Sequence, residues 1–233
     1  MKNILKVASM ALVLSLTLFG ITNKASAAKL TLYCSVEIDV CEMLEQAYEK
    51  ETGTKVAMTR ASSGETFAKI KAEASNPKGD VWFGGTGDPH LTAAQENLTE
   101  KYKSVHFNDL LPAAQNQAKN ADFKSVGIYV GALGFGYNKD LLAKKGLPAP
   151  KSWMDLTKPI YKGEIQVANP NSSGTAYTTL ATILQIFGED KGWDYMKKLH
   201  ANINTYTKSG SAPIKATGRG ENLIGICFQH DGV

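Results

Sequence analysis

Small hydroxyl and glycine residues cluster at several places where the chain turns from a strand-like into a helix-like pattern. These clusters are Ser62 to Gly64, Gly85 to Asp88, Ser172 to Thr175 and Lys208 to Ser211. Glycine lets a ligand approach the backbone, hydroxyls add hydrogen-bond donors, and the start of a helix favours negative charge. Each cluster alone is equally typical of ordinary helix capping. Their recurrence predicts a site for phosphate, phosphonate or carboxylate.

Ionisable residues lie beside these turns. His90 follows Asp88, while His230 and Asp231 come directly after an apolar run. A histidine beside a carboxylate can bind hydroxyls, anions or a metal, although solvated loop histidines fit the same spacing. Lys208 precedes its Ser-Gly turn and would complement a bound anion.

The elements that must position these residues alternate from Lys29 onward between strand-like and helix-like periods. This alternation predicts a layered α/β protein with mixed, mostly parallel sheets and flanking helices. Strands are expected at 30–33, 55–59 and 80–83, each followed by a helix. Ligands of open α/β sheets bind beyond the carboxyl ends of the strands, which is where the first turns fall.

A second region begins near residue 128, where an apolar, glycine-interrupted stretch to residue 135 suggests a crossing between two lobes. Strands are expected at 164–168 and 223–228. A long helical period between them is interrupted at Gly188. We therefore expect an N-terminal lobe over 28–127 and a C-terminal lobe over 128–233.

The first residues have the pattern of an export signal. Lys2 and Lys6 precede an apolar run over 7–21, and a small-residue pattern ends at Ala27. The run is about 15 residues long, which is short of the about 20 that a membrane-spanning helix needs. Residues 1–27 are therefore predicted to be a cleaved signal peptide rather than an anchor.

Export makes disulfides possible, and Cys34 and Cys41 lie between an expected strand and an expected helix. We expect them to be bridged unless their Cα atoms lie beyond about 7 Å. Cys227 lies in an apolar run and is expected to be a buried thiol. The three cysteines lack the spacing of a zinc site.

Charge and motifs exclude other classes. With 26 basic and 22 acidic residues the formal charge is +4, without a basic run, so no nucleic-acid partner is expected. The sequence has no G-x-S-x-G or H-E-x-x-H motif, which disfavours the alternative of a secreted hydrolase. We expect a binding protein, not an enzyme, and no cofactor.

Several stretches resemble periplasmic solute-binding proteins of ABC importers, in the branch of ferric-iron, hexose-phosphate and aminoethylphosphonate binders. They are Tyr33 to Ser35, Arg60 to Thr66, Lys78 to His90, Asn169 to Thr179, Tyr206 to Lys215, and His230 with Asp231. The resemblance implies a two-lobe, type II fold with the ligand closed between the lobes. It also implies periplasmic delivery of a small anionic solute to an inner-membrane ABC permease. Because such proteins are longer, we expect this chain to be truncated at its C-terminus.

The same resemblance implies roles for individual residues. The turn from Ser172 to Thr175 would cradle the anion, Ser62 and Ser63 would donate from the other lobe, and His230 with Asp231 would hold sugar hydroxyls. The ligand-binding residues so predicted are Ser35, Ser62, Ser63, Thr86, Asp88, Ser172, Ser173, Gly174, Thr175, Lys208, His230 and Asp231.

Ferric iron with a companion anion is the alternative ligand. Iron binders of this branch typically use adjacent tyrosines, and no two tyrosines here are adjacent. Tyr177 and Tyr206 could still supply phenolates, which are hard oxygen ligands of the kind that ferric ion prefers.

Overall fold

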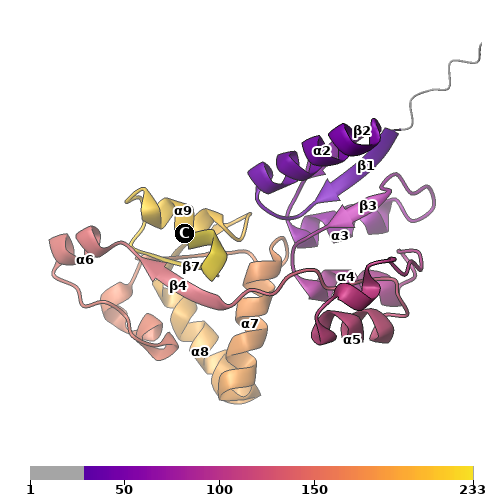
Figure 1. The fold of residues 1–233 in the computed structure, drawn as a ribbon. Coiled ribbons are helices and arrows are strands. Elements are labelled where there is room, and N and C mark those ends of the chain that lie inside the picture. Colours follow the sequence, from indigo (N-terminus) through magenta and orange to yellow (C-terminus); the bar gives the residue numbers. More distant parts are fainter. Residues whose placement is uncertain (1–28, 233) are drawn as a thin grey trace, which may run out of the picture.

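The computed structural model describes residues 29–232, so the predicted signal peptide at 1–27 lies outside the described residues. The chain forms two lobes, each with its own sheet (Figure 1). The first sheet is parallel, in the order β2-β1-β3. Its elements are β1 (Lys29–Cys34), α2 (Ile38–Thr52), β2 (Lys55–Arg60), α3 (Ser63–Ala72), β3 (Val81–Phe83), α4 (Gly87–Gln95), η1 (Phe107–Asp109) and α5 (Pro112–Asn120).

The second lobe has a four-stranded sheet in the order β4-β7-β5-β6, in which β4 runs antiparallel to β7 and the other pairs are parallel. Its strands are β4 (Leu133–Tyr137), β5 (Ile165–Ala168), β6 (Ile203–Thr207) and β7 (Ile224–Phe228). Its helices are α6 (Lys139–Lys145), η2 (Trp153–Thr157), η3 (Pro159–Tyr161), α7 (Gly174–Phe187), α8 (Glu189–Asn202), α9 (Ala212–Gly218) and η4 (Gln229–Gly232). The predicted mixed, mostly parallel α/β fold is confirmed.

Sequence signals at the helix ends explain where the helices begin and stop. Helix α2 ends at Gly53, whose φ of 71° is left-handed and favours glycine. Gly188, with φ of 79°, separates α7 from α8. Ser62 and Glu65 form the predicted capping box at the start of α3, since each side chain bonds the other residue's backbone. The capping box places the start of α3 directly after the end of β2.

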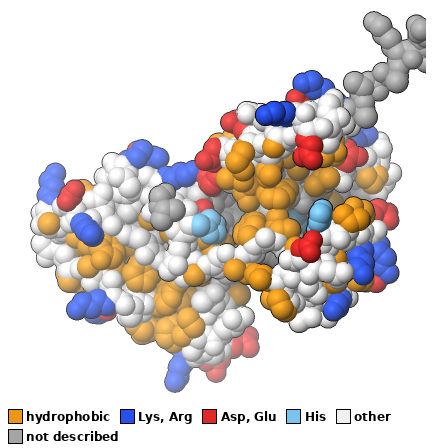
Figure 2. Space-filling view, viewed as in Figure 1, with side chains coloured by type: hydrophobic (Ala, Val, Ile, Leu, Met, Phe, Trp, Pro, Cys, Tyr) orange, Lys and Arg blue, Asp and Glu red, His pale blue; other side chains and the backbone are white. Residues whose placement is uncertain are grey.

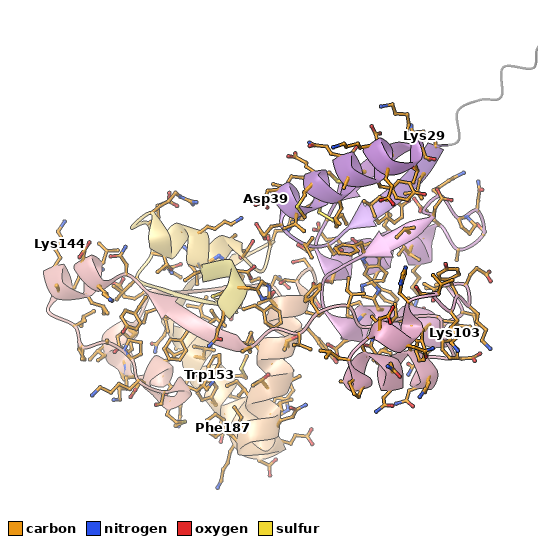
Figure 3. The ribbon with its side chains drawn as sticks, in the orientation of Figure 1. Lys29, Asp39, Lys103, Lys144, Trp153 and Phe187 are labelled. Atoms are coloured by element: carbon orange, nitrogen blue, oxygen red, sulfur yellow. A yellow bond between two sulfur atoms is a disulfide. The ribbon has the colours of Figure 1, made fainter. Side chains whose placement is uncertain are left out.

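The larger core lies in the second lobe, where strands β5 and β7 pack against α7 and α8. Its fully buried side chains include Leu156, Ile165, Ile183, Leu199 and Ile226. Trp153 and Phe187, which are labelled in Figure 3, are partly buried and pack against this core. This packing makes the second lobe a firm support for the turns described below.

Both expectations about cysteine are confirmed. Cys34 and Cys41 form a disulfide that joins the end of β1 to α2 and is part of the small core of the first lobe. Cys227 is buried in β7, and burial raises the pKa of its thiol to about 12. The thiol is therefore protonated at neutral pH.

The first lobe buries less apolar surface. Figure 2 shows hydrophobic side chains gathered on the visible face of this lobe. Large hydrophobic residues of this lobe that remain exposed include Met43, Val81, Tyr102 and Val105. None of the helices between residues 29 and 232 is both long enough and apolar enough to cross a membrane.

A single segment around residues 126–132 connects the lobes, in the region where the sequence predicts a crossing. Tyr129 fixes this segment to the first lobe, because its hydroxyl donates to the Gly85 carbonyl at 2.9 Å and accepts from the Gly85 amide at 2.8 Å. The strands of the first sheet come before residue 127 in the chain, and those of the second sheet come after it. The exact boundary between the lobes at that residue remains a prediction.

A polar cleft between the lobes

A cleft of about 870 Å³ lies between the two lobes, and residues from both of them line it. The predicted ligand-binding residues on its wall are Ser35, Ser62, Ser63, Thr86, Asp88, Ser173, Gly174, Thr175, His230 and Asp231. Of the predicted set, Ser172 and Lys208 are not on the wall. The turns at Ser62, Gly85 and Ser173 thus converge on one cleft, while the ligand role of each residue remains a prediction.

The convergence follows from the strand directions. Strands β1, β2 and β3 are parallel, so their carboxyl ends meet at one edge, where Ser35, Ser62 and Gly85 follow them. Strand β5 ends at Ala168, and the turn after it leads into α7 from the other lobe. Donors from two sheets therefore face the same space.

Hydrogen bonds hold the turns of the first lobe together. The Thr86 amide donates to Ser63 Oγ at 3.2 Å. A Cβ atom on Gly85, whose φ is 85°, would lie 2.2 Å from the same Oγ, so glycine is required there. Trp82 Nε1 donates to Ser35 Oγ at 2.9 Å. The hydroxyl of Ser35 therefore already serves the packing of the lobe.

Helix α7 points its N-terminus at the cleft. Ser173 caps the helix by accepting a hydrogen bond from the Ala176 amide at 3.4 Å. The amides of Gly174 and Thr175 belong to the first helical turn, where an α-helix offers no internal acceptor. The helix dipole also favours negative charge at this end. A small anion fits these donors chemically.

One buried hydroxyl at the lobe junction lacks a partner. Thr86 Oγ1 faces Gly174 so closely that a Cβ atom there would lie 2.0 Å away. Within residues 29–232 this oxygen is buried and has no hydrogen-bond partner. An unsatisfied buried polar group costs about 1–3 kcal/mol. The contact with Gly174 leaves no room for a ligand atom between the two turns, so this hydroxyl marks a tight contact between the lobes.

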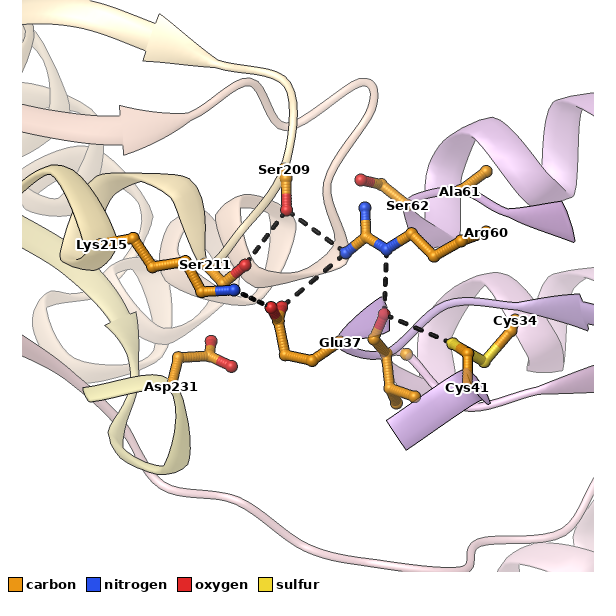
Figure 4. A network of polar contacts seen from close by, with 12 residues as sticks. Cys34, Glu37, Cys41, Arg60, Ala61, Ser62, Ser209, Ser211, Lys215 and Asp231 are labelled. Carbon is orange, nitrogen blue, oxygen red and sulfur yellow. Dashed lines mark hydrogen bonds and ion pairs between the residues drawn. A yellow bond between two sulfur atoms is a disulfide. The ribbon is translucent and has the colours of Figure 1, made fainter. Parts of the chain in front are cut away.

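A charged network that joins the lobes also lines the cleft (Figure 4). Glu37 is ion-paired with Lys215 of the second lobe and lies 3.8 Å from the Arg60 guanidinium. Arg60 also donates to the Val36 carbonyl at 2.9 Å and to Ser209 Oγ at 3.4 Å. The two cations are thus engaged by protein groups rather than left free in the cleft.

The protonation of Glu37 reflects this network. Burial alone would raise the pKa of its carboxyl group. Hydrogen bonds from Lys215 and Ser211, together with the charges of Lys215 and Arg60, outweigh burial and hold the pKa below its ordinary value. Glu37 is therefore ionised at neutral pH.

Asp39, which also lines the cleft, lies at the end of α2 that faces the second lobe (Figure 3).

His230 and Asp231 lie in η4, directly after β7, and both line the cleft. His230 Nε2 is 3.7 Å from Asp231 Oδ1, and its ring stacks on Phe228 with 5.5 Å between centroids. The Asp231 side chain is only 8% exposed, and burial raises the pKa of its carboxyl group. The pair can accept from and donate to hydroxyl groups of a ligand.

Three other predicted candidates lie elsewhere. His90 stacks on Trp82 with 3.6 Å between centroids and lines a different cavity, within the first lobe. Burial lowers the pKa of its imidazole. The Tyr206 hydroxyl is 2.7 Å from His200 Nδ1, and neither Tyr206 nor Tyr177 lines the cleft. The structure thus does not bring the two candidate phenolates to the cleft.

Residues that the sequence reasoning did not select also line the cleft. They include Glu37, Arg60, Tyr129 and Lys215, while Ser209 and Ser211 of the predicted turn at Lys208 to Ser211 line it as well. Arg60 could have been found, since it ends β2 directly before the Ser62 turn. Glu37 and Lys215 carry no local signal, because their pairing joins residues 178 positions apart. Within the described part of the chain, no group of three or more His, Cys, Asp or Glu residues could hold a metal ion.

Comparisons with known proteins agree with this architecture. A family model described as "Bacterial extracellular solute-binding protein" matches residues 80–230. An uncharacterized protein of Haemophilus influenzae is 44% identical over 228 residues, which are 97% of this chain and 65% of that protein. A putative 2-aminoethylphosphonate-binding periplasmic protein of Salmonella typhimurium is 30% identical over 158 residues, 67% of this chain and 43% of that protein.

A solved structure is similar in fold as well as in sequence. The periplasmic binding protein AfuA of Actinobacillus pleuropneumoniae, with exogenous fructose-6-phosphate bound, has 46% identity and a TM-score of 0.86, over 89% of this chain and 65% of AfuA. This chain therefore spans about two thirds of the length of such relatives. The family description and the two relatives described by function are those of binding proteins, the class that the sequence predicts. The chain belongs to the family of bacterial extracellular solute-binding proteins.

Proposed function

We propose that this chain captures a small anionic ligand, a sugar phosphate, phosphonate or similar compound, between its two lobes for uptake by an ABC importer. The observation that carries the proposal is the convergence of three hydroxyl-and-glycine turns from both lobes on one cleft. The buried hydroxyl of Thr86 without a partner lies at their junction. An anion bound in the cleft would meet neutral donors from both lobes.

The cleft wall offers two kinds of binding group, which supports a phosphorylated ligand over an inorganic anion. The helix N-terminus at Ser173 takes the anionic group, whereas His230 and Asp231 offer partners for hydroxyls. The volume of about 870 Å³ lies within the range of about 300–1,000 Å³ typical of small-molecule sites. AfuA, with its bound sugar phosphate, and the aminoethylphosphonate-binding relative support ligands of this class.

The route of delivery is part of the proposal. The sequence pattern of residues 1–27 and the periplasmic relatives support export to the periplasm. There the closed, loaded chain would meet an inner-membrane permease. Closure is favoured because both lobes contact the ligand only when they meet, so the ligand binds the closed form more tightly than the open one.

Isothermal titration of the purified chain with fructose 6-phosphate, 2-aminoethylphosphonate and ferric citrate tests the proposal. We expect heat of binding from at least one of the two organophosphorus compounds and a loss of at least about tenfold in affinity for Ser173→Ala, since a bound anion loses a charge-assisted donor worth about 1.5–3 kcal/mol. Ser152→Ala is the matched control, because Ser152 also caps a helix but lies outside the cleft. Binding of ferric citrate alone, or equal effects of the two substitutions, would contradict the proposal.

A further inference from the structure

A second set of contacts joins the lobes beside the cleft. The Gly64 amide, in the first turn of α3, donates to the Ser172 carbonyl at 3.0 Å. The Lys208 carbonyl accepts from Ser172 Oγ at 3.0 Å and from Ser62 Oγ at 3.4 Å. An orphan amide at the start of α3 thus finds its acceptor in the other lobe. The bonds from Gly64 and Ser62 cross between the lobes and require the lobes to be in contact, whereas the bond from Ser172 Oγ to Lys208 lies within the second lobe and fixes the two acceptors relative to each other.

An ion pair completes this set. Lys208 Nζ lies 2.5 Å from Glu65 Oε1, across the lobe boundary. The other oxygen, Glu65 Oε2, accepts from the Ser62 amide at 3.3 Å in the capping box of α3. Glu65 therefore connects the position of Lys208 to the start of α3. The Lys208 side chain is 78% exposed and that of Glu65 27% exposed, so salt will screen the pair.

We propose that Ser62, Gly64, Glu65, Ser172 and Lys208 form an interlobe clasp. The clasp holds in register the two turns proposed to bind the anion, Ser62–Ser63 and Ser173–Thr175, which together are called the cradle. The inference rests on the proposed function for its purpose. Lys208 and Ser172 are positioning residues in this scheme, and they do not touch the ligand. Ser62 joins the clasp through its hydroxyl although it also lines the cleft.

The order of residues along the chain explains why the clasp controls the cradle. Ser172 directly precedes Ser173, and Gly64 directly follows Ser63. Ser63 and Ser173 face the cleft, while Gly64 and Ser172 face each other. A shift of the clasp therefore moves the neighbouring cradle donors by a comparable amount. Such a displacement would weaken the hydrogen bonds to the ligand, because hydrogen bonds weaken steeply outside their normal geometry.

Gly64 gives the sharpest test because of its close approach to the other lobe. A Cβ atom at this position would lie 2.5 Å from the Asn171 carbonyl oxygen and 3.0 Å from that of Ser172. Both obstacles are backbone atoms and cannot rotate away. Since alanine forms helices better than glycine, Gly64→Ala should not destabilise α3 itself. The control is Gly218→Ala, whose new Cβ atom meets nothing within 4 Å.

We expect Gly64→Ala to enlarge the radius of gyration of the unliganded chain in small-angle X-ray scattering. Affinity for fructose 6-phosphate should fall at least about fivefold, as expected when overpacking of about 1–3 kcal/mol opposes closure. Urea denaturation of the unliganded variant should show unchanged or higher stability. Wild-type dimensions together with wild-type affinity would overturn the clasp.

A double-mutant cycle tests the ion pair. Glu65→Gln removes the charge but keeps the capping box, in which glutamine also serves. Lys208→Met and Glu65→Gln should each weaken binding about two- to fivefold, and the double variant should be no weaker than either single variant. Lys145→Met is the control, because Lys145 pairs with Glu164 within one lobe.

The outcomes separate the clasp from the proposed function. If the wild-type chain binds none of the organophosphorus probes, the proposed function fails. The radius of gyration of the unliganded variants still tests the clasp in that case. If binding occurs but the losses of Lys208→Met and Glu65→Gln add, Lys208 contacts the ligand directly and the clasp is refuted.

Discussion

Glu37→Gln should change which anions the cleft accepts. Glu37 neutralises Lys215 and Arg60 on the cleft wall, and at 3.8 Å its attraction to Arg60 is about 4 kcal/mol for an effective dielectric constant of about 20. The two side chains are each 25% exposed, so solvent reduces this to about 1–2 kcal/mol. Removing the carboxylate charge makes this amount available to a second anionic group on a ligand.

The expected result is a change in selectivity. The ratio of affinities for fructose 1,6-bisphosphate and fructose 6-phosphate should rise about 5- to 30-fold in Glu37→Gln, which corresponds to about 1–2 kcal/mol. Isothermal titration at low ionic strength measures both affinities, and the gain should shrink as salt is added. The reason is that only the bisphosphate carries a second phosphate, which Arg60 and Lys215 can attract once Glu37 no longer neutralises them.

Glu49→Gln is the matched control. Glu49 pairs with Lys55 in the same lobe and is 24% exposed, yet it lies away from the cleft. A selectivity ratio that stays at the wild-type value in Glu37→Gln, or that rises equally in Glu49→Gln, would refute the reasoning. The first result would mean that Arg60 and Lys215 do not reach the ligand when Glu37 no longer engages them.

Further substitutions test the cradle, the disulfide and the buried acid. Gly174→Ala should weaken binding of fructose 6-phosphate at least about tenfold in calorimetry, because its Cβ would lie 2.0 Å from Thr86 Oγ1 in the other lobe. Replacing Cys34 and Cys41 by serine should lower the free energy of unfolding in urea by about 2.5 kcal/mol, since their sequence separation is 7, and an unchanged midpoint would contradict this. Because burial raises the pKa of Asp231 above 3.8, its ionisation opposes folding, and stability is lost as pH rises from about 3.8 through the folded-state pKa. Asp231→Asn should therefore gain stability over wild type at pH 7 but not at pH 3, and an equal difference at both would contradict it.

Much of the fold could be predicted because it depends on local signals. The periodicity of α2 and α7, the glycine stops at Gly53 and Gly188, and the capping box at Ser62 all act within one or two helical turns. The position of the cleft also followed, since parallel strands place their carboxyl ends at one edge. The parallel arrangement of the strands therefore allows the positions of strand ends in the sequence to predict where a site lies in the fold.

The charged network could not be predicted in the same way. Glu37 stands at the start of α2 and looks like any solvated helix residue in the sequence. Its partner Lys215 lies 178 residues further along, and only the packing of the two lobes brings them together. Whether a charged residue near a strand end faces a ligand or a distant ion pair therefore depends on tertiary structure, which spacing does not encode.

The turn before α7 shows how far a motif can be carried over residue by residue. Ser172 and Ser173 are adjacent and chemically identical, so a sequence pattern assigns them the same role. In the folded chain the Ser173 hydroxyl caps α7 on the cleft wall, whereas the Ser172 hydroxyl donates to the Lys208 carbonyl beside the cleft. Successive side chains leave a tight turn in different directions, so the Ser173 hydroxyl lies on the cleft wall while the Ser172 hydroxyl bonds a backbone carbonyl of its own lobe. A Ser-Gly turn therefore predicts the place of an anion site, while the packing of the turn within its lobe decides what each hydroxyl contacts.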